Sequence, residues 1–288
     1  MKIRRLACKE AGVAFAFLAP SLAGFALFYL IPFGQNVLIS FQGRLEGEGW
    51  TLAGYRELLL SSSFRQAAAN TLWFNALGVP VLVVLSLFLA LLLNQRVFFR
   101  NWLRTAYVLP LVVPAASIVM VWQILFDWNG SLNAAGHHFG LSRQDWMKSD
   151  GSGTILILIY IWKYAGYNIV LFLAGLQNIP ESYYEVADME GAGPVRKLQI
   201  TLTYLTPTTV LVVLMSLLNS FKIFRETYLL AGDYPYDRIY MMQHYMNNMF
   251  LSLDIQKLSA AATFMAAGIL ALVAVLLRIE RAFSSFME

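Results

Sequence analysis

Polar side chains interrupt two long apolar segments of this 288-residue chain, at about residues 154–175 and 207–230. Tyr160, Lys163 and Tyr167 are three and four residues apart, so a helix would place them on one face. The second segment contains a polar patch formed by Ser216, Asn219, Ser220 and Lys222. A lysine at the centre of a bilayer costs about 2.5–3.5 kcal/mol on insertion scales. Each lysine therefore either snorkels toward an interface or faces a water-filled cavity.

Motifs for the common catalytic chemistries are absent from the sequence. No G-x-x-x-x-G-K-[ST] phosphate loop occurs, so the chain does not itself carry that kind of ATPase site. No Ser-His-Asp set, H-E-x-x-H motif or pair of acids stands near an apolar segment. Cys8 is the single cysteine, and His137, His138 and His244 fall in predicted loops, where a solvated surface role is expected. The sequence predicts no cofactor and no metal, and a membrane enzyme is a weak alternative.

The elements that carry the polar side chains are predicted to be membrane-spanning helices. Hydrophobic residues make up 58% of the chain and charged residues 13%, whereas a typical soluble domain has about 25% charged residues. A helix needs about 20 apolar residues to cross the hydrocarbon of a bilayer. Six segments meet this requirement, at about 12–32, 71–93, 105–126, 154–175, 207–230 and 258–277. The predicted fold is an all-α integral membrane protein with six transmembrane helices over residues 12–288.

Lysine and arginine residues predict the orientation of these spans. Four basic residues precede the first predicted span, at Lys2, Arg4, Arg5 and Lys9. Three more crowd the short connection between the second and third spans, at Arg96, Arg100 and Arg104. Cytoplasmic loops carry the excess of basic residues, so both termini, including residues 1–11, are predicted to be cytoplasmic. The connections that would then lie outside are about 33–70, 127–153 and 231–257.

The segment EVADMEGAGPVRKLQITLTYLTP, which begins at Glu185, is polar although it lies between the fourth and fifth predicted spans. Pro180 suits the first position of a helix, which would be acidic. Gly191 and Gly193 can form a turn, because glycine adopts positive φ at low cost. Pro194 can then start a second short helix. The prediction is a cytoplasmic helix–turn–helix pair, which is either a solvated linker or a docking surface for a soluble protein.

The same segment resembles the EAA motif of permease subunits of ATP-binding-cassette importers. The family pattern is Glu-Ala-Ala, three residues, Gly, and then Ile-x-Leu-Pro. The matching residues here are Glu185, Ala187, Gly191, Ile200 and Leu202. This sequence departs from the pattern in three ways: Val186 replaces the first alanine, Thr203 replaces the proline, and one residue fewer separates Gly191 from Ile200. The resemblance nevertheless explains why a polar, turn-rich segment lies between two membrane spans.

The resemblance extends over nearly the whole chain. FLAPSLAGFALFYLIPFGQNVLISF is similar to the first span of the sugar-importer branch of this family. YVLPLVVPAASIVMVWQILFDWNGSLN is similar to its third span, with matching spacing at Pro110, Pro114, Trp122, Phe126, Asp127, Gly130 and Asn133. FLAGLQNIPESYYEVADMEGAGP is similar to the exit of the fourth span. The chain therefore resembles the first permease subunit of the maltose and glycerol-3-phosphate type.

Membership of this family would assign roles to both groups of residues. The EAA coupling-helix loop, at about 178–206, would dock on a cytoplasmic ATPase through Glu185, Val186, Ala187, Asp188, Gly191 and Ala192. The substrate pathway would include Tyr160, Lys163, Tyr167, Ser216, Asn219, Ser220 and Lys222, whose groups suit a sugar. The implied partners are a second permease, two ATP-binding subunits, which hold the ATP, and an extracellular solute-binding protein. The implied location is a bacterial plasma (inner) membrane.

Other transport functions remain alternatives at this stage. An importer of glycerol-3-phosphate or another small polar solute would have the same architecture. An ATP-independent secondary transporter is less compatible with the sequence, because proton-coupled carriers need ionisable groups within their spans. Glu226 is an exception among spans that contain almost no carboxylates. If both lysines face the pathway, an anionic sugar becomes more plausible than a neutral one.

Overall fold

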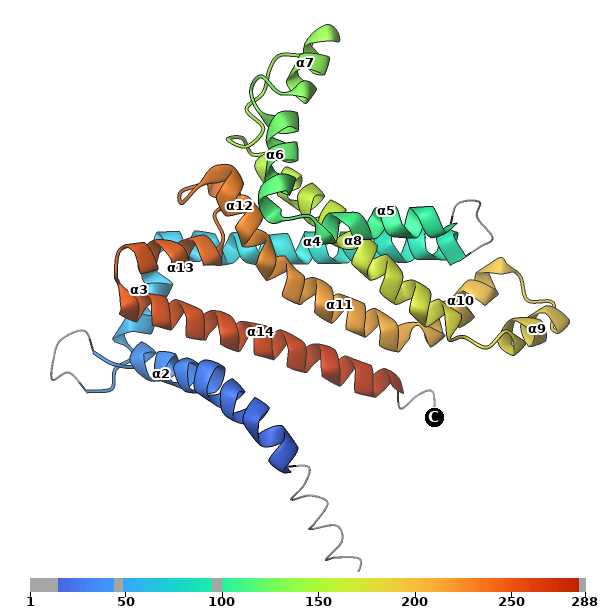
Figure 1. Cartoon of the computed structure of the whole chain (residues 1–288), viewed down its shortest axis with the longest axis horizontal. Helices are drawn as coiled ribbons and strands as arrows, with labels where there is room; N and C mark the ends of the chain where they lie inside the picture. The colour runs from blue at the N-terminus through green and yellow to red at the C-terminus, as the bar shows by residue number, and fades with distance from the viewer. Residues whose placement is uncertain (1–14, 44–48, 95–99, 285–288) are drawn as a thin grey trace, which may run out of the picture. The chain divides into compact units, whose positions relative to one another are not determined.

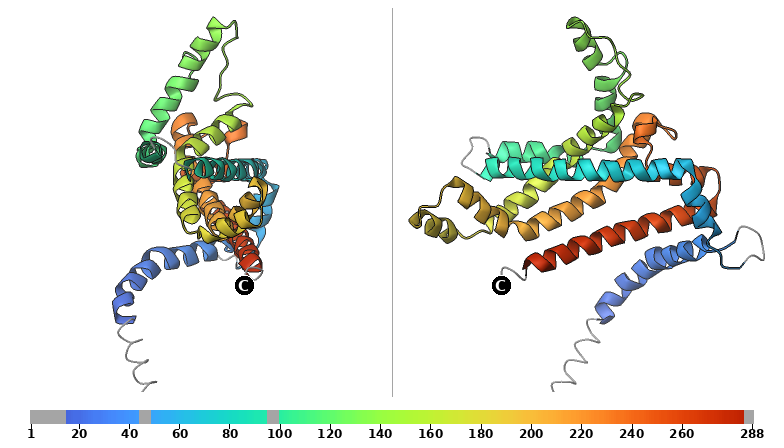
Figure 2. Two further views of the ribbon diagram at one scale, coloured as in Figure 1. Left: turned by 90° about the vertical axis from the view of Figure 1, so that its right-hand side faces the viewer. Right: turned by 180° about the vertical axis from the view of Figure 1, so that it is seen from behind.

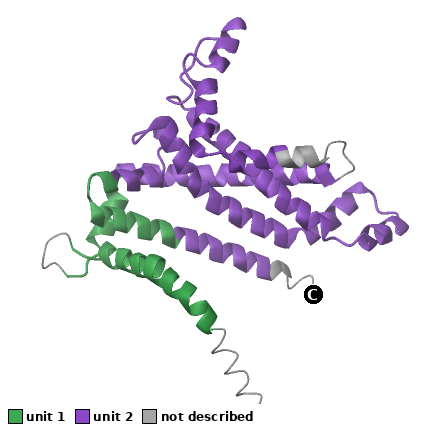
Figure 3. Ribbon diagram, in the orientation of Figure 1, with its two compact units in different colours: residues 1–61, 249–267 green, residues 62–248, 268–288 purple. Residues whose placement is uncertain are grey.

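The computed structural model describes residues 15–43, 49–94 and 100–284, and these residues form helices joined by short connections (Figure 1). The chain divides into two compact units (Figure 3). The first comprises Met1–Ser61 and Met249–Ala267, and the second comprises Ser62–Asn248 and Gly268–Glu288. Within the described residues, β pairing is limited to one isolated bridge between Gln42 and Trp50.

Five helices are long and apolar enough to cross a membrane, and a bent pair makes six if it is counted as one span. The five are Phe15–Ser40, Ser62–Asn94, Ser152–Gln177, Thr206–Ala231 and Ile255–Arg281. Each overlaps a span predicted from hydropathy, and residues 12–14 of the first prediction lie outside the described part. Helix α4 begins nine residues before the second predicted span, because the sequence SSFRQAAAN is helical as well. The predicted all-helical membrane architecture is confirmed.

The third predicted span, 105–126, is broken rather than continuous. Helix α5 (Arg100–Val112) and helix α6 (Ala115–Phe126) meet at Pro114, and the apolar stretches on either side of the break are bent by 111°. Pro114 is extended, with φ −56° and ψ 142°, and proline has no N–H to continue a helix. A further helix, α7 (Ser131–His138), follows α6. A hydropathy sum measures only how apolar a segment is, so it does not predict this break in the helix.

The first unit contains α2 (Ile31–Ser40), α3 (Ala53–Leu60) and the first part of α14 (Ile255–Ser284). A π-helical turn, Ala26–Leu30, leads into α2. The side-chain amide of Asn36 donates to the hydroxyl of Thr263 at 3.2 Å, which ties α2 to α14. None of the apolar window of Phe15–Ser40 is buried inside the chain, so this span presents its side chains to lipid or to another protein.

The second unit is built around α8 (Ser152–Gln177). This helix contacts α4 (Ser62–Asn94), α5 and α11 (Thr206–Ser220), and Figure 2 shows these helices from two further directions. Its apolar window is the most buried of the five, at 56%. Gly166 allows α5 to approach α8 closely, because a Cβ at this position would lie 1.7 Å from the carbonyl oxygen of Tyr107. Because α8 also packs against α11, the polar side chains of these two helices are brought together inside this unit.

Candidate functional site

Hydrogen bonds between polar side chains join α8 to α11. The Tyr160 hydroxyl donates to the Ser216 carbonyl at 2.6 Å, and the Asn168 amide donates to the Ser216 hydroxyl at 2.7 Å. Tyr160 has no exposed surface, and its ring lies edge-on to Phe74 at 5.3 Å between centroids. Tyr160 and Ser216 were predicted to line a pathway, but the structure places both in the interior of the chain. Asn168 belongs to the same network and was not singled out from the sequence.

Lys163 is paired with the acid of the fifth span. Its ammonium donates to the Glu226 carboxylate, and it also lies 5.1 Å from the centre of the Tyr164 ring. The Glu226 side chain is fully buried, and that of Lys163 is only 12% exposed. Hydropathy and spacing suggested a lysine that snorkels or faces water, because a partner 63 residues away cannot be seen in a local pattern. The charge of Lys163 is compensated within the chain.

The remaining polar residues gather where the fifth span is interrupted. Helix α11 ends at Ser220, a 3₁₀ turn η2 covers Phe221–Ile223, and α12 (Phe224–Ala231) completes the span. Ser220 donates to the Asn75 side-chain carbonyl of α4 at 2.5 Å, and Lys222 donates to that of Asn219 at 3.0 Å. The structure therefore brings Asn219, Ser220 and Lys222 together. Ser220 and Asn219 are buried, Lys222 is exposed, and Tyr167 is half-buried on α8.

Two short helices, α9 and α10, connect α8 to α11. Helix α9 (Ser182–Met189) begins two residues after Pro180, whereas α10 (Pro194–Tyr204) begins at the predicted proline. Gly191 has φ +72°, and the N–H groups of Gly191 and Ala192 donate to the carbonyls of Asp188 and Ala187. This pattern is the Schellman motif, which needs a residue at positive φ. The predicted helix–turn–helix and the positive φ of Gly191 are confirmed.

Side-chain contacts fix the angle between α9 and α10. Lys197 forms an ion pair with Asp188, and the hydroxyls of Tyr184 and Thr201 lie 2.8 Å apart. Ala187, whose carbonyl accepts the Ala192 N–H, is buried. Several large apolar side chains of the pair remain exposed, namely Tyr183, Val186, Met189, Val195, Leu198 and Leu202. Thr203 stays within α10, where its hydroxyl bonds to the Gln199 carbonyl at 2.9 Å.

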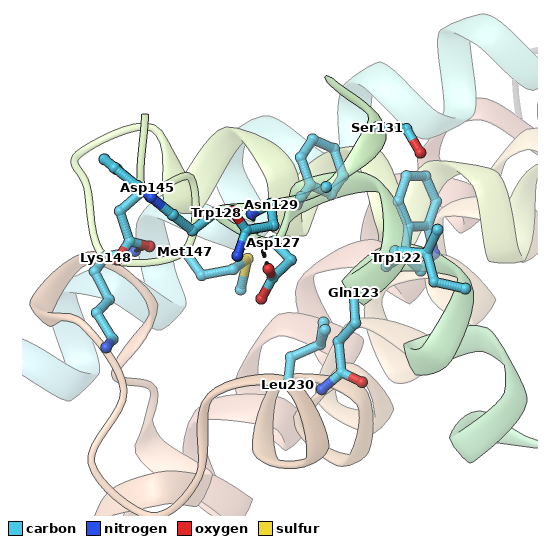
Figure 4. Close-up of a pocket in the computed structure, with 13 residues that line it drawn as sticks. Trp122, Gln123, Asp127, Trp128, Asn129, Ser131, Asp145, Met147, Lys148 and Leu230 are labelled. Carbon is cyan, nitrogen blue, oxygen red and sulfur yellow. Dashed lines mark hydrogen bonds between the residues drawn. The ribbon is translucent and has the colours of Figure 1, made fainter. Parts of the chain in front are cut away.

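The connection after α6 is organised by one buried amide. The Asn133 side chain donates to the carbonyls of Asp127, Trp128 and Gln144 and accepts from the Gln144 N–H and the Trp146 indole, at 2.9–3.3 Å. Beside it lies a pocket of about 720 Å³, which Figure 4 shows. The labelled lining side chains include Trp122, Gln123, Asp127, Trp128, Asp145 and Lys148. Asn133 thus joins the turn at Asp127–Trp128 to the segment at Gln144–Trp146, a contact that sequence spacing does not reveal.

His244, in α13 (Met242–Leu251), is fully buried, contrary to the expected surface role. Its Nδ1 accepts the N–H of Met241 at 3.3 Å, and its ring packs edge-on against Phe224 at 4.8 Å. Burial lowers the pKa of His244 to about 4, although the nearby Asp233 charge acts in the opposite direction. Over the described residues, no three His, Cys, Asp or Glu side chains are grouped to hold a metal ion.

Most of the chain matches one known protein family. Residues 82–288 match the family described as "Binding-protein-dependent transport system inner membrane component". The chain belongs to this family. As an inner membrane component of a transport system, it is a multi-pass membrane protein and a transport component. This membership confirms the importer-permease family suggested by the EAA-like segment.

Curated relatives of this inner membrane component are named as permeases. The arabinooligosaccharides transport system permease protein AraP of Bacillus subtilis is 34% identical over 233 residues, covering 79% of this chain and 74% of AraP. The sn-glycerol-3-phosphate transport system permease protein UgpA of Yersinia pestis is 30% identical over 210 residues, covering 70% of each chain.

The fold of the inner membrane component also matches solved structures. A chain in the crystal structure of a bacterial alginate ABC transporter, in complex with alginate pentasaccharide-bound periplasmic protein, superposes with a TM-score of 0.82. It is 22% identical in sequence, and the match covers 95% of this chain and 96% of that one. At this identity the similarity establishes the fold.

Proposed function

We propose that this inner membrane component forms half of the translocation pathway of an ATP-driven importer for a sugar or oligosaccharide. An extracellular solute-binding protein would deliver the saccharide, a second permease would complete the pathway, and two separate subunits would bind and hydrolyse ATP. A saccharide substrate is supported by the names of two similar proteins, the arabinooligosaccharide permease AraP and the alginate transporter. Residues 12–288 would form one permease domain. UgpA supports a second candidate, import of glycerol-3-phosphate or a similar small solute.

The observation that carries the ATP-driven mechanism is the α9–α10 pair. The Schellman turn at Gly191 and the Asp188–Lys197 ion pair hold two short helices at a defined angle. Large apolar side chains on this pair are left uncovered, with Met189 81% and Val195 70% exposed. A rigid element with an exposed apolar surface suits the transmission of force from a soluble subunit. The proposed coupling residues are Glu185, Val186, Ala187, Asp188, Gly191 and Ala192.

Substitution on the exposed face of the pair tests the docking role. Met189→Glu and Val195→Glu place charges on the proposed contact and should reduce both co-purification of the ATP-binding subunit and saccharide uptake. Leu141→Glu is the matched control, because Leu141 is also an exposed apolar residue, at 64%, in a different connection. Full recovery of the ATP-binding subunit with both α9–α10 variants would contradict the assignment.

The proposed orientation places both termini and the α9–α10 pair in the cytoplasm of a bacterium. Gly49 and Gly193 are suitable reporter positions, because a Cβ at either would meet no atom within 4 Å. In a Cys8→Ala background, a cysteine at Gly49 should react with an impermeant maleimide added outside, and one at Gly193 only after the membrane is opened. The reverse accessibility would rule out this orientation.

A further inference from the structure

The exposed residues of the fifth span form a single stripe. Within Thr206–Ala231 they follow one another at intervals of four, seven, four, three and four residues, and they are Pro207, Leu211, Leu218, Lys222, Arg225 and Leu229. Spacings of three, four and seven keep residues on one face of a helix. The rest of this span is buried or half-buried in the second unit. Lys222 and Arg225 therefore lie on the same exposed face, flanked on both sides by leucine.

The positive charges of this stripe have no counter-charge in the described part of the chain. Lys222 bonds to the neutral side chain of Asn219 at 3.0 Å. Arg225 lies near the neutral Tyr164 side chain, and none of the ion pairs among the described residues includes Arg225. The single acid of the span, Glu226, is fully buried and pairs with Lys163 of α8 instead of with Lys222 or Arg225. Lys163, which the sequence grouped with Lys222, is thus already neutralised, whereas Lys222 and Arg225 have no acidic partner among the described residues.

The depth of these cations argues against a face turned to lipid. A helix rises about 1.5 Å per residue, so Arg225 and Lys222 lie about 9 and about 14 Å along the helix from Ala231. Half the hydrocarbon thickness is about 15 Å. Charged side chains at such depth face a bundle interior or a water-filled cavity in membrane proteins. The stripe is therefore suited to the side of the span that faces the pathway.

We propose that Lys222 and Arg225 form an anion-binding site on the pathway, and that the imported saccharide carries an acidic group. This inference rests on the proposed function and narrows its substrate class. Residues three apart on a helix have Cβ atoms about 5–6 Å apart, a separation that lets both cations reach the oxygens of one carboxylate. The planar guanidinium of arginine pairs with carboxylate through two parallel hydrogen bonds, and lysine adds a point charge. The neighbouring Asn219 amide could bind saccharide hydroxyls.

The test uses the complete complex, reconstituted in liposomes with its partner permease, ATP-binding subunits and binding protein. ATP-driven uptake of digalacturonate is compared with uptake of its neutral counterpart, galactobiose. The variant Lys222→Met with Arg225→Met removes both charges, and Lys222→Arg with Arg225→Lys keeps them. Because all variants share one binding protein, a change in the ratio of the two uptake rates reports on the permease.

We expect the wild-type complex to import digalacturonate, and the double Met variant to lose at least about tenfold of that uptake, as for loss of one charge-assisted contact. Galactobiose uptake should change less than about twofold, and the charge-preserving variant should keep most digalacturonate uptake. If the double Met variant is poorly recovered, Lys222→Met alone, with Arg225 retained, should show a smaller selective loss.

Several results would overturn the proposal. Equal loss of both saccharides with poor recovery of the partner permease would assign the cations to an acid on that partner. Unchanged uptake of both saccharides by the double Met variant would indicate that Lys222 and Arg225 face lipid phosphate or water instead of the saccharide. A wild-type complex that imports only galactobiose would overturn the anion site and leave the importer function intact. Absence of ATP-driven uptake of any saccharide would instead remove the proposed function, and the anion site with it.

Discussion

Removal of Lys163 from its buried ion pair should destabilise the protein strongly, and removal of both partners should restore most of the loss. Lys163 on α8 bonds to the fully buried carboxylate of Glu226 on α12. The second carboxylate oxygen of Glu226 is buried and has no hydrogen-bond partner among the described residues. Lys163→Met keeps the aliphatic length of the side chain and leaves Glu226 as a buried charge with no counter-ion.

The size of the effect follows from this burial. Breaking a buried pair by removing one partner costs about 3–5 kcal/mol, because the other charge is left uncompensated. With an unfolding entropy of about 2.1 cal/mol/K per residue, the 288-residue chain loses about 0.6 kcal/mol per degree near its midpoint. The apparent melting temperature in detergent should therefore fall by about 5–8 °C.

A double-mutant cycle is the assay. Lys163→Met, Glu226→Gln and their combination are melted in the same detergent, and the combination should recover at least half of the loss seen for Lys163→Met alone. Lys257→Met is the control, because Lys257 pairs at 3.3 Å with Asp254 and both side chains are partly exposed. Loss of such an exposed pair costs about 1 kcal/mol or less. Strictly additive effects of the two span substitutions would refute the pairing argument.

Three further predictions concern residues outside the spans. Gly191→Val should reduce recovery of the ATP-binding subunit on co-purification, because a left-handed residue with a Cβ costs about 1–2 kcal/mol, whereas Gly191→Asn, which tolerates φ +72°, should retain it. Asn133→Asp should make the connection after α6 sensitive to limited proteolysis, because a carboxylate would face three carbonyl oxygens and lose hydrogen bonds worth about 1 kcal/mol each; unchanged protease resistance would contradict its organising role. His244 has a pKa of about 4 in the folded chain and about 6.5 when unfolded, so the unfolded state takes up the proton first and stability should fall by up to about 3 kcal/mol between pH 6.5 and pH 4. His244→Asn should flatten that part of the pH profile of melting, and His137→Asn, at an exposed position, should not.

Local features of the sequence were enough to predict the long apolar helices and the turn between α9 and α10, but not the break at Pro114 or the short helices α3, α7 and α13 within the predicted connections. Span position depends on the summed hydropathy of about 20 consecutive residues, and that sum is independent of any other part of the chain. The turn depends on Gly191 and Pro194, whose backbone preferences are intrinsic to the residue. The structure bears out both, with φ +72° at Gly191 and α10 starting at Pro194.

The roles of the polar residues depended on partners far away in sequence. Lys163 and Lys222 are equivalent in a hydropathy plot, yet one is neutralised by Glu226 and the other lies on an exposed stripe. His244 was expected at the surface and is buried against Phe224, and Tyr160 was expected on a pathway and lies in the core. The sequence by itself determined which segments are long and apolar enough to span a membrane, because summed hydropathy is a local property. Only the tertiary structure decided which charges are paired and which face outward, because this depends on how helices that are far apart in the chain pack together.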